Sequence, residues 1–163
     1  MRIKSIMAAV SALVMSISAI APVSISAADN EYYRDSFESG EGDWTGRGSA
    51  TVSASSSKAY DGSSSLFVEG RAENWNGASK ALSTDTFVPG QSYSFSVNVM
   101  GPSEEKENTF HLTLQYNGSD GEAHYDKIAS GTAYGGEWIQ LSNNNFEIPS
   151  GASDLSIYVE TEN

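Results

Sequence analysis

The sequence predicts an all-β domain built as a two-sheet antiparallel β-sandwich. Apolar and polar residues alternate in several short runs, turn sequences separate these runs, and no stretch has the periodicity of an amphipathic helix. Short strands that each have one apolar face are stabilised when two sheets pack face to face, and a closed barrel is the main alternative. The predicted domain covers residues 29–163, which is the length of one domain.

The first half of this domain contains three predicted strands. The short runs "ATVSA" (50–54) and "SLFVEG" (65–70) are separated by a loop with the turn sequence "YDGS". The run "SYSFSVNV" (92–99) follows the turn "VPGQ" and places its aromatic residues and valines on one face and its serines on the other. Each of these runs is therefore expected to bury one face.

The second half contains four predicted strands, with the turn sequences "NGSDGE", "YGGE" and "IPSGAS" between them. In the first of these strands His111, Thr113 and Gln115 alternate with apolar residues, and in the last Tyr158 and Glu160 lie opposite three aliphatic residues. The four runs are "FHLTLQY" (110–116), "HYDKIA" (124–129), "WIQL" (138–141) and "LSIYVE" (155–160).

Residues 1–28 have the layout of a secretory signal peptide. The cationic start "MRIKS" is followed by an apolar run and then by the small residues "SAA" ahead of Asp29. The apolar run is long enough for an uncleaved membrane anchor, which is the alternative, but Pro22 and the small residues favour cleavage after Ala28. The sequence therefore predicts a secreted protein without a membrane segment after cleavage.

Composition excludes several kinds of function. The formal net charge of −12 at pH 7 opposes binding to nucleic acid and to anionic lipid, so neither is an expected partner. The chain has no cysteine and only two histidines, which excludes thiol catalysis, disulfides, thiolate zinc sites and imidazole-rich metal centres. An oxygen-ligated calcium ion is the natural candidate if a metal helps to hold the fold.

The polar faces of the predicted strands offer the groups that a neutral sugar chain needs. An aromatic ring can lie against the C–H groups of a pyranose, and guanidinium or carboxylate groups can pair with its hydroxyls. Tyr158 and Glu160 share one face of the last predicted strand, and Arg47, Trp75 and Tyr125 add two rings and a forked donor. A rigid sheet loses little conformational entropy when such groups bind a ligand.

Trp75 lies in the polar stretch "RAENWNGASK" (71–80), where a hydrophobic side chain is unexpected. A loop resists folding such a residue inward because the backbone must stay hydrated or paired, so we expect an exposed indole at the rim of the polar face. The alternatives are a buried tryptophan, a core-edge position for Tyr125, and a structural ion pair between Arg47 and Glu160.

Two other classes of function compete with sugar binding. A glycoside hydrolase needs two carboxylates across the scissile bond, but most acidic residues here, such as Asp120 and Glu122, lie in predicted turns where they are solvated. A small domain with a flat sheet also has poor means of excluding water from a reaction. A protein-interaction domain would need a contiguous apolar patch, which the polar strand faces do not suggest. Non-catalytic binding is therefore favoured.

The sequence from about Tyr33 to Glu160 resembles carbohydrate-binding module family 22, the xylan-binding domains usually attached to family 10 xylanases. The most specific elements are "W.GRG" and "GR…WNGA". The resemblance implies a jelly-roll sandwich with a cleft for xylan and xylooligosaccharides, in a monomeric, non-catalytic module of a secreted bacterial enzyme, and leaves mixed-linkage glucan open as a second ligand. It is carried by "DSFESGEGDWTGRGSATV", "GSSSLFVEGRAENWNGA", "FVPGQSYSFSVNV", "LTLQY", "HYDKIA", "GGEWIQL" and "LSIYVET".

The resemblance also implies binding residues and no catalytic ones. The rings would flank a xylose unit, and the arginine and the glutamate would bond its hydroxyls. Trp44, Trp138 and Arg71 are instead assigned to structure. The implied binding residues are Arg47, Trp75, Tyr125, Tyr158 and Glu160.

Members of this family hold a structural calcium ion near the chain termini. Glu38 matches the side-chain ligand on the family's first strand, so it is the predicted metal ligand here. The family's final strand and its aspartate ligand have no counterpart before Asn163. Either the sequence is a fragment of a longer protein or the domain lacks its closing strand. In the second case an unpaired sheet edge and an incomplete calcium site are expected.

Overall fold

The structure is a computed structural model that describes residues 33–101 and 106–162. The predicted signal peptide, residues 1–28, lies outside these ranges. The chain divides into Met1–Arg34 and a compact unit, Asp35–Asn163, whose described part contains nine strands. Among the residues that the structure describes, no helix is long and apolar enough to cross a membrane.

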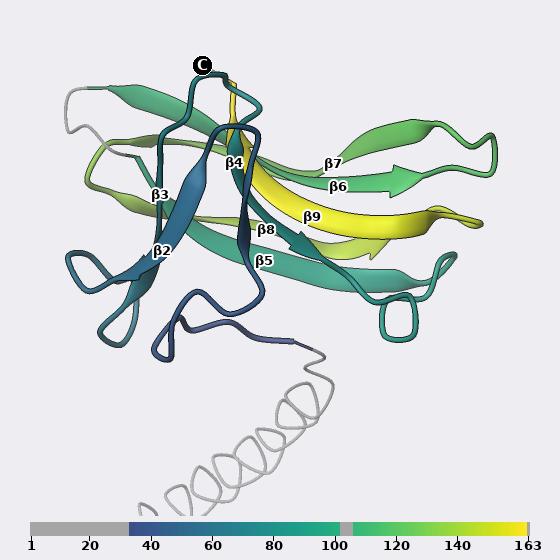
Figure 1. Ribbon diagram of the computed structural model, residues 1–163, viewed down its shortest axis with the longest axis horizontal. Coiled ribbons are helices and arrows are strands. Elements are labelled where there is room, and N and C mark those ends of the chain that lie inside the picture. Colours follow the sequence, from purple (N-terminus) through teal and green to yellow (C-terminus); the bar gives the residue numbers. More distant parts are fainter. Residues whose placement is uncertain (1–32, 102–105, 163) are drawn as a thin grey trace, which may run out of the picture. The chain divides into compact units, whose positions relative to one another are not determined.

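The strands form one five-stranded antiparallel sheet and two two-stranded ribbons (Figure 1). The five-stranded sheet has the order β1-β4-β9-β6-β7, and the ribbons are β2-β3 and β5-β8. The all-β antiparallel prediction is therefore confirmed, although the layer opposite the large sheet is not one continuous sheet. The strands are β1 Thr45–Arg47, β2 Thr51–Ser55, β3 Ser65–Glu69, β4 Gly77–Ala81, β5 Ser92–Met100, β6 Glu107–Asn117, β7 Ala123–Tyr134, β8 Trp138–Glu147 and β9 Ser153–Thr161.

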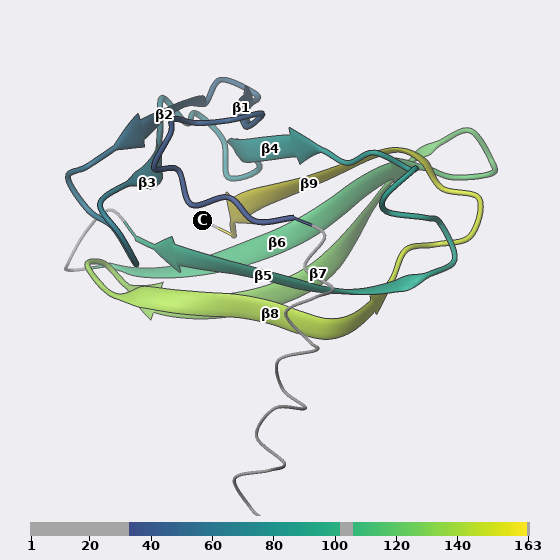
Figure 2. The same cartoon turned by 90° about the horizontal axis from the view of Figure 1, so that it is seen from below.

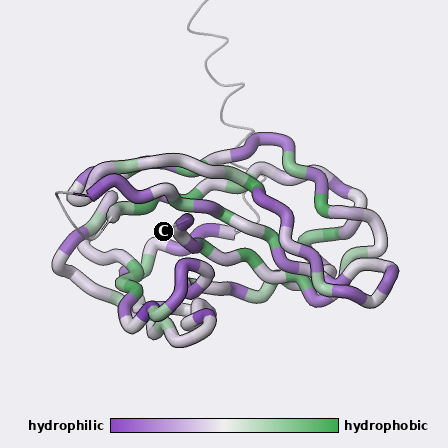
Figure 3. The backbone as a smooth tube through the Cα atoms, turned by 90° about the horizontal axis from the view of Figure 1, so that it is seen from above, coloured by the Kyte–Doolittle hydropathy of each residue, from purple (hydrophilic) through white to green (hydrophobic). Residues whose placement is uncertain are grey.

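The hydrophobic core lies between the five-stranded sheet and the β5-β8 ribbon (Figure 2). Leu112 and Leu114 of β6 pack there with Leu141 of β8 and Leu155 of β9, and all four are almost completely buried. Figure 3 shows hydrophobic and hydrophilic segments following each other closely along the tube. Because successive side chains of a strand point to opposite faces, this alternation leaves polar side chains on the other face of the large sheet.

Strands β1 and β4 have no apolar alternation and were not predicted. A Cβ atom at Gly77 in β4 would lie 1.8 Å from the carbonyl oxygen of Val159, and one at Gly46 in β1 would lie 1.8 Å from that of Ala50. Glycine is therefore required where these strands approach their neighbours. Close backbone approach, rather than hydrophobic periodicity, defines the β1-β4 side of the sheet.

A buried ion pair fastens the N-terminal segment of the compact unit to β4. The Lys80 side chain is 4% exposed, and its Nζ lies 3.2 Å from Oδ2 of Asp35. The same carboxylate oxygen accepts a 2.6 Å hydrogen bond from Nε1 of Trp44. Burial lowers the pKa of Lys80. Trp44 thus has the structural role that the sequence indicated.

Strand β9, the last described strand, lies inside the sheet between β4 and β6. It is hydrogen-bonded on both sides, to residues 78–81 of β4 and along most of β6. The pairing of β9 does not test the expectation of an unpaired edge, which concerned the place of a missing closing strand, so this expectation stays a prediction. In the described part of the chain the edges of the sheet are β1 and β7.

Candidate binding site on the five-stranded sheet

The face of the large sheet that points away from the core carries two rows of aligned side chains. Each row crosses β4, β9, β6 and β7, because residues paired in register project from the same face. The central row is Ser79, Tyr158, Thr113 and Lys127, and the distal row is Ala81, Ser156, Gln115 and Tyr125.

A β-bulge in the β6-β7 ladder keeps the β7 residues of these rows on the outer face. The register shifts between Leu112 and Thr113, so that Ile128 has no direct partner on β6. Ile128 is buried in the core while Tyr125 remains 54% exposed. Bulges commonly re-aim side chains next to functional sites.

The loop that carries Trp75 is organised around the buried amide of Asn76. Its Oδ1 accepts hydrogen bonds from Ser49 Oγ at 2.7 Å, from the Ala72 N–H at 3.0 Å and from the Glu73 N–H at 3.1 Å. These bonds replace the hydration that the loop backbone would otherwise need. The indole of Trp75 is left 45% exposed, which confirms the predicted exposure.

Arg71 ties the same loop to the end of β9. Its Nε donates to the Asn76 carbonyl at 2.7 Å, and its Nη2 donates to the Asn74 carbonyl at 2.7 Å and to Thr161 Oγ1 at 2.6 Å. Burial lowers the pKa of Arg71, although nearby Glu160 acts in the opposite direction. The structural assignment of Arg71 is therefore confirmed, and its function is to hold the Trp75 loop.

Gly48 gives the indole room at the other side of the loop. Its φ of +69° is in the left-handed region, and a Cβ atom there would lie 2.7 Å from Cζ3 of Trp75 and 2.1 Å from Nδ2 of Asn76. The sequence signal for this contact is the glycine that follows Arg47 in "TGRG". Sequence reasoning did not connect this glycine, or Asn76, with the placement of Trp75.

The guanidinium of Arg47 lies among three aromatic rings. Its Cζ is 3.9 Å from the ring centroid of Tyr158, 5.2 Å from that of Trp75 and 5.8 Å from that of Tyr125. Its Nη1 donates to the Trp75 carbonyl at 2.8 Å, and its Nη2 donates to Gln115 Oε1 at 3.3 Å. Glu160 is not among these partners, so the contacts do not support the alternative of a structural ion pair between Arg47 and Glu160.

Tyr158 is on the predicted face of β9, but its ring is only 3% exposed. The Arg47 guanidinium covers it, and burial is the main reason why the pKa of Tyr158 is raised. The expectation that this ring flanks a ligand therefore needs correction. The guanidinium stacks on the ring of Tyr158. The exposed rings of the site are those of Trp75 and Tyr125.

Glu160 extends the same face beyond the central row. Its Oε1 accepts a 3.0 Å hydrogen bond from Thr113 Oγ1, and the residue opposite it in the ladder is His111. The buried imidazole of His111 has Nδ1 2.8 Å from Ser130 Oγ. Burial, followed by the charge of Lys127, lowers the pKa of His111, while Glu162 and Glu160 partly oppose this shift.

Four of the five predicted binding residues enclose one open cavity of about 410 Å³, lined by Arg47, Trp75, Tyr125 and Tyr158. We call it the aromatic cavity. Glu160, the fifth predicted residue, is not among its lining residues but lies two positions from Tyr158 on the same face. The cavity thus offers two exposed ring faces beside a fixed, charged hydrogen-bond donor.

Glu38, the predicted calcium ligand, supports a turn. Its Oε1 accepts hydrogen bonds from the N–H groups of Ser63 and Ser64, both at 2.9 Å. Within residues 33–101 and 106–162 no three acidic or histidine side chains gather as a metal site would require. These side chains alone therefore do not supply a calcium site, and the calcium ion stays a prediction.

The model of a protein family described as "Carbohydrate binding domain" matches residues 29–163. Among curated proteins, the chain is 48% identical over 140 residues to a "Xylanase/beta-glucanase" of Ruminococcus flavefaciens, covering 85% of this chain and 17% of that protein. It is 44% identical over 134 residues to "Endo-1,4-beta-xylanase Y" of Acetivibrio thermocellus, covering 82% of this chain and 12% of that protein. The chain thus spans less than a fifth of these relatives.

The chain is also similar to solved structures of carbohydrate-binding modules. The "Xylan-Binding Domain from CBM 22" superposes with a TM-score of 0.79 at 44% identity, covering 81% of this chain and 85% of the other. The C-terminal family 22 module of Clostridium thermocellum Xyn10B superposes with a TM-score of 0.79 at 43% identity, covering 81% and 84%. In that Clostridium thermocellum module, conserved amino acids in the cleft have a role in ligand binding.

Proposed function

Because this chain belongs to carbohydrate-binding module family 22, we propose that it binds xylan and xylooligosaccharides without catalysing their cleavage. The observation that carries the proposal is the aromatic cavity, in which the exposed rings of Trp75 and Tyr125 lie around one guanidinium. A xylose unit presents C–H groups to such rings and hydroxyls to such a donor.

Each residue of the site has a distinct role in this proposal. Trp75 and Tyr125 supply the ring faces that contact the sugar, because they are the exposed aromatic residues of the cavity. Arg47 donates to the sugar hydroxyls through the guanidinium N–H groups that Trp75 and Gln115 do not use. Glu160 accepts from a hydroxyl, and Tyr158 positions Arg47 from below.

Binding without hydrolysis follows from the groups that line the cavity. A glycosidase places two carboxylates on either side of the scissile bond, and the lining of the aromatic cavity contains none. The neutral character of xylose units also suits a strongly acidic chain, which would repel an anionic polymer.

The function of the whole protein is a further part of the proposal. The matched relatives are xylanases several times longer than this chain, so we propose that the module is attached to a secreted plant-cell-wall-degrading enzyme. Binding would raise the local concentration of that enzyme on the polysaccharide. The proposed signal peptide at residues 1–28 is consistent with this location.

Affinity electrophoresis tests the proposal. The chain should migrate more slowly in a native gel that contains soluble xylan than in a gel without it, and the Trp75→Ala variant should lose most of this retardation. Tyr134→Ala is the matched control because Tyr134 is 58% exposed but does not line the aromatic cavity. Equal migration of the wild-type chain in both gels would refute xylan binding.

Two further measurements on the wild-type chain test a second ligand and the hydrolase alternative. A parallel gel with mixed-linkage β-glucan tests whether the cavity accepts glucose units as well as xylose units. Release of reducing sugar from xylan by the chain would support the alternative that the domain is itself a hydrolase.

A further inference from the structure

Thr113 of β6 lies on the outer face of the five-stranded sheet, but a ligand on that face has no access to it. The residue is 2% exposed, yet its hydroxyl donates a 3.0 Å hydrogen bond to Oε1 of Glu160. We infer that Thr113 is a positioning residue, which holds the Glu160 carboxylate in the orientation that a bound polysaccharide requires. The inference rests on the proposed function, in which Glu160 accepts a hydrogen bond from a sugar hydroxyl.

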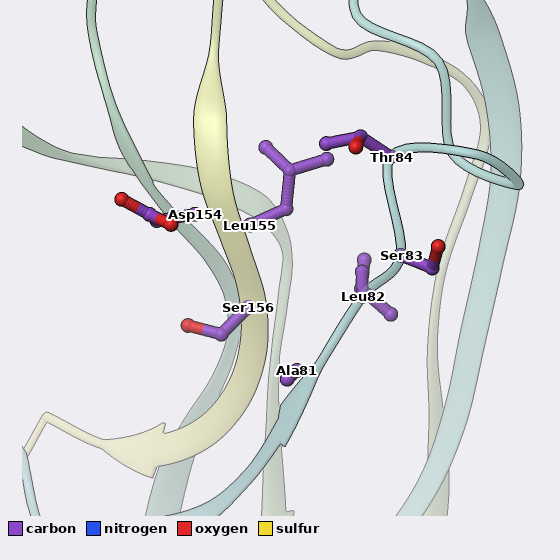
Figure 4. A pocket seen from close by; sticks show the side chains of 7 residues that line it. All are labelled: Ala81, Leu82, Ser83, Thr84, Asp154, Leu155 and Ser156. Atoms are coloured by element: carbon purple, nitrogen blue, oxygen red, sulfur yellow. The ribbon is translucent and has the colours of Figure 1, made fainter.

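The strand register brings these two side chains together. Figure 4 shows the alternation at the start of β9, where the side chain of Leu155 points to one side of the strand and that of Ser156 to the other. Leu155 belongs to the core, so the other side is the outer face. Tyr158 and Glu160 follow Ser156 by steps of two and therefore lie on that face. Thr113 is paired with Tyr158, which makes Glu160 its diagonal neighbour on β9.

The hydrogen bond to Thr113 decides the direction in which the Glu160 carboxylate turns. The residue directly opposite Glu160 in the ladder is His111, whose Nδ1 already lies 2.8 Å from Ser130 Oγ. A carboxylate that turned straight across to β6 would meet this imidazole. The bond to Thr113 instead turns it along the sheet toward Tyr158, which lines the aromatic cavity. Thr113 thus brings the acceptor to the side of the site where the sugar is proposed to bind.

The same hydrogen bond leaves acceptor capacity for a ligand. Oε1 of Glu160 receives the bond from Thr113, and no residue in the described part of the chain donates to Oε2. An ionised carboxylate has about four lone-pair positions, so the group can accept a further hydrogen bond. Glu160 is partly exposed, whereas Thr113 is buried. One oxygen is therefore held from within the sheet, while the other is free to accept from a sugar hydroxyl.

Threonine suits this role because its hydroxyl has little freedom of its own. A β-branched side chain is restricted at χ1, and Thr113 is in addition enclosed by its neighbours. A glutamate side chain has several rotatable bonds, and ordering them when a ligand binds costs affinity. The bond to Thr113 orders the carboxylate before the ligand arrives. We expect the loss of this bond to lower the affinity for xylohexaose about five-fold.

Calorimetric titration with xylohexaose tests the role of the hydroxyl. Thr113→Val has a similar shape without the hydroxyl and should bind about five-fold more weakly than wild type. Thr113→Ala also lacks the hydroxyl and should show the same loss, so the test does not depend on the folding of one variant. Thr113→Ser keeps the hydroxyl and should bind within about two-fold of wild type.

Thr109→Val is the matched control. Thr109 is on the same strand, but its hydroxyl lies 3.0 Å from Oγ1 of Thr132 and does not bond to Glu160, so this variant should bind xylohexaose like wild type. A second measurement needs no ligand. The order parameters of the Glu160 side chain, from NMR relaxation, should fall in Thr113→Val and stay at the wild-type values in Thr109→Val.

The outcomes separate this inference from the proposed function. If the wild-type chain binds xylohexaose and Thr113→Val binds it equally well, the positioning role is refuted and xylan binding stands. Equal losses in Thr113→Ser and Thr113→Val, or an unchanged mobility of the Glu160 side chain, would also refute it. If the wild-type chain binds no xylooligosaccharide, the proposed function fails, and the NMR measurement alone decides whether Thr113 orders Glu160. A loss that Thr113→Ser rescues, together with a more mobile Glu160 side chain in Thr113→Val, supports the inference.

Discussion

The guanidinium of Arg47 lies 3.9 Å from the ring centroid of Tyr158 and leaves that ring 3% exposed. The ring of Tyr158 supports the guanidinium of Arg47, which is the charged hydrogen-bond donor of the aromatic cavity. Cation–π contacts of this kind are most stabilising when the cation is partly desolvated. In the proposed complex the sugar would therefore contact the guanidinium, and Tyr158 would act through Arg47.

This relationship predicts different results for two substitutions of Tyr158. Tyr158→Phe keeps the ring beneath Arg47 and should bind xylohexaose within about two-fold of wild type. Tyr158→Ala removes the ring that supports the Arg47 guanidinium and should weaken xylohexaose binding about ten-fold, because a cation–π contact of this kind contributes about 1–2 kcal/mol. Calorimetric titration measures both affinities. Equal losses in the two variants would show instead that the Tyr158 hydroxyl contacts the sugar.

The position of Trp75 should depend on Arg71, although Arg71 does not line the aromatic cavity. Arg71→Ala removes three hydrogen bonds that join the Trp75 loop to itself and to Thr161. We expect faster amide hydrogen exchange in residues 72–76 and a xylan affinity about three- to ten-fold lower, because the loop must then be ordered on binding. Unchanged exchange in this loop together with unchanged affinity would contradict the positioning role.

The sequence predicted those parts of the fold and the site that depend on local pattern. The alternation of Phe110, Leu112 and Leu114 with polar residues predicted β6, because these three apolar side chains lie on the face of the strand that packs in the hydrophobic core. The polar neighbours of Trp75 predicted its exposure for a similar reason. Strand β4 could not be predicted in this way, since Gly77 is selected by the approach of the β9 backbone.

The burial of Tyr158 is a long-range effect. Tyr158 follows the polar alternation of β9 and was expected on an open face. Its cover, Arg47, comes from β1, a three-residue strand without any hydrophobic pattern. A local pattern shows the face to which a side chain points, but not what another segment places on top of it. For the same reason the hydrogen bonds of Asn76 to Ser49 and the Ala72 N–H were not foreseen.

Glu38 gives a prediction that separates its hydrogen bonds from the proposed calcium ion. Glu38→Ala removes the acceptor for two backbone N–H groups and should lower the free energy of unfolding by about 1 kcal/mol. Glu38→Gln keeps an oxygen acceptor and should be close to wild type in a thermal melt with chelator present. If Glu38 also ligates calcium, added calcium should raise the melting temperature of the wild-type chain more than that of Glu38→Gln.

His111 predicts how stability changes with pH. Burial and Lys127 lower its folded-state pKa below the ordinary value of 6.5, so the unfolded chain binds more protons between these two pKa values. The free energy of unfolding should therefore rise with pH through this window and level off above about pH 6.5. Below the folded-state pKa both states are protonated, and the contribution of His111 becomes constant.

The His111→Gln variant isolates this contribution. The difference in free energy of unfolding between wild type and His111→Gln, measured by urea titration at a series of pH values, should become more favourable to wild type as the pH rises through this window. The carboxylates titrate in both proteins, so their contribution largely cancels in the difference. The pH dependence of the free energy of unfolding should persist in His124→Gln, because His124 lies at the start of β7 beside Asp120 and is paired with Tyr116, whereas His111 is paired with Ser130. A difference that does not depend on pH would show that His111 is not held in its neutral form by the fold.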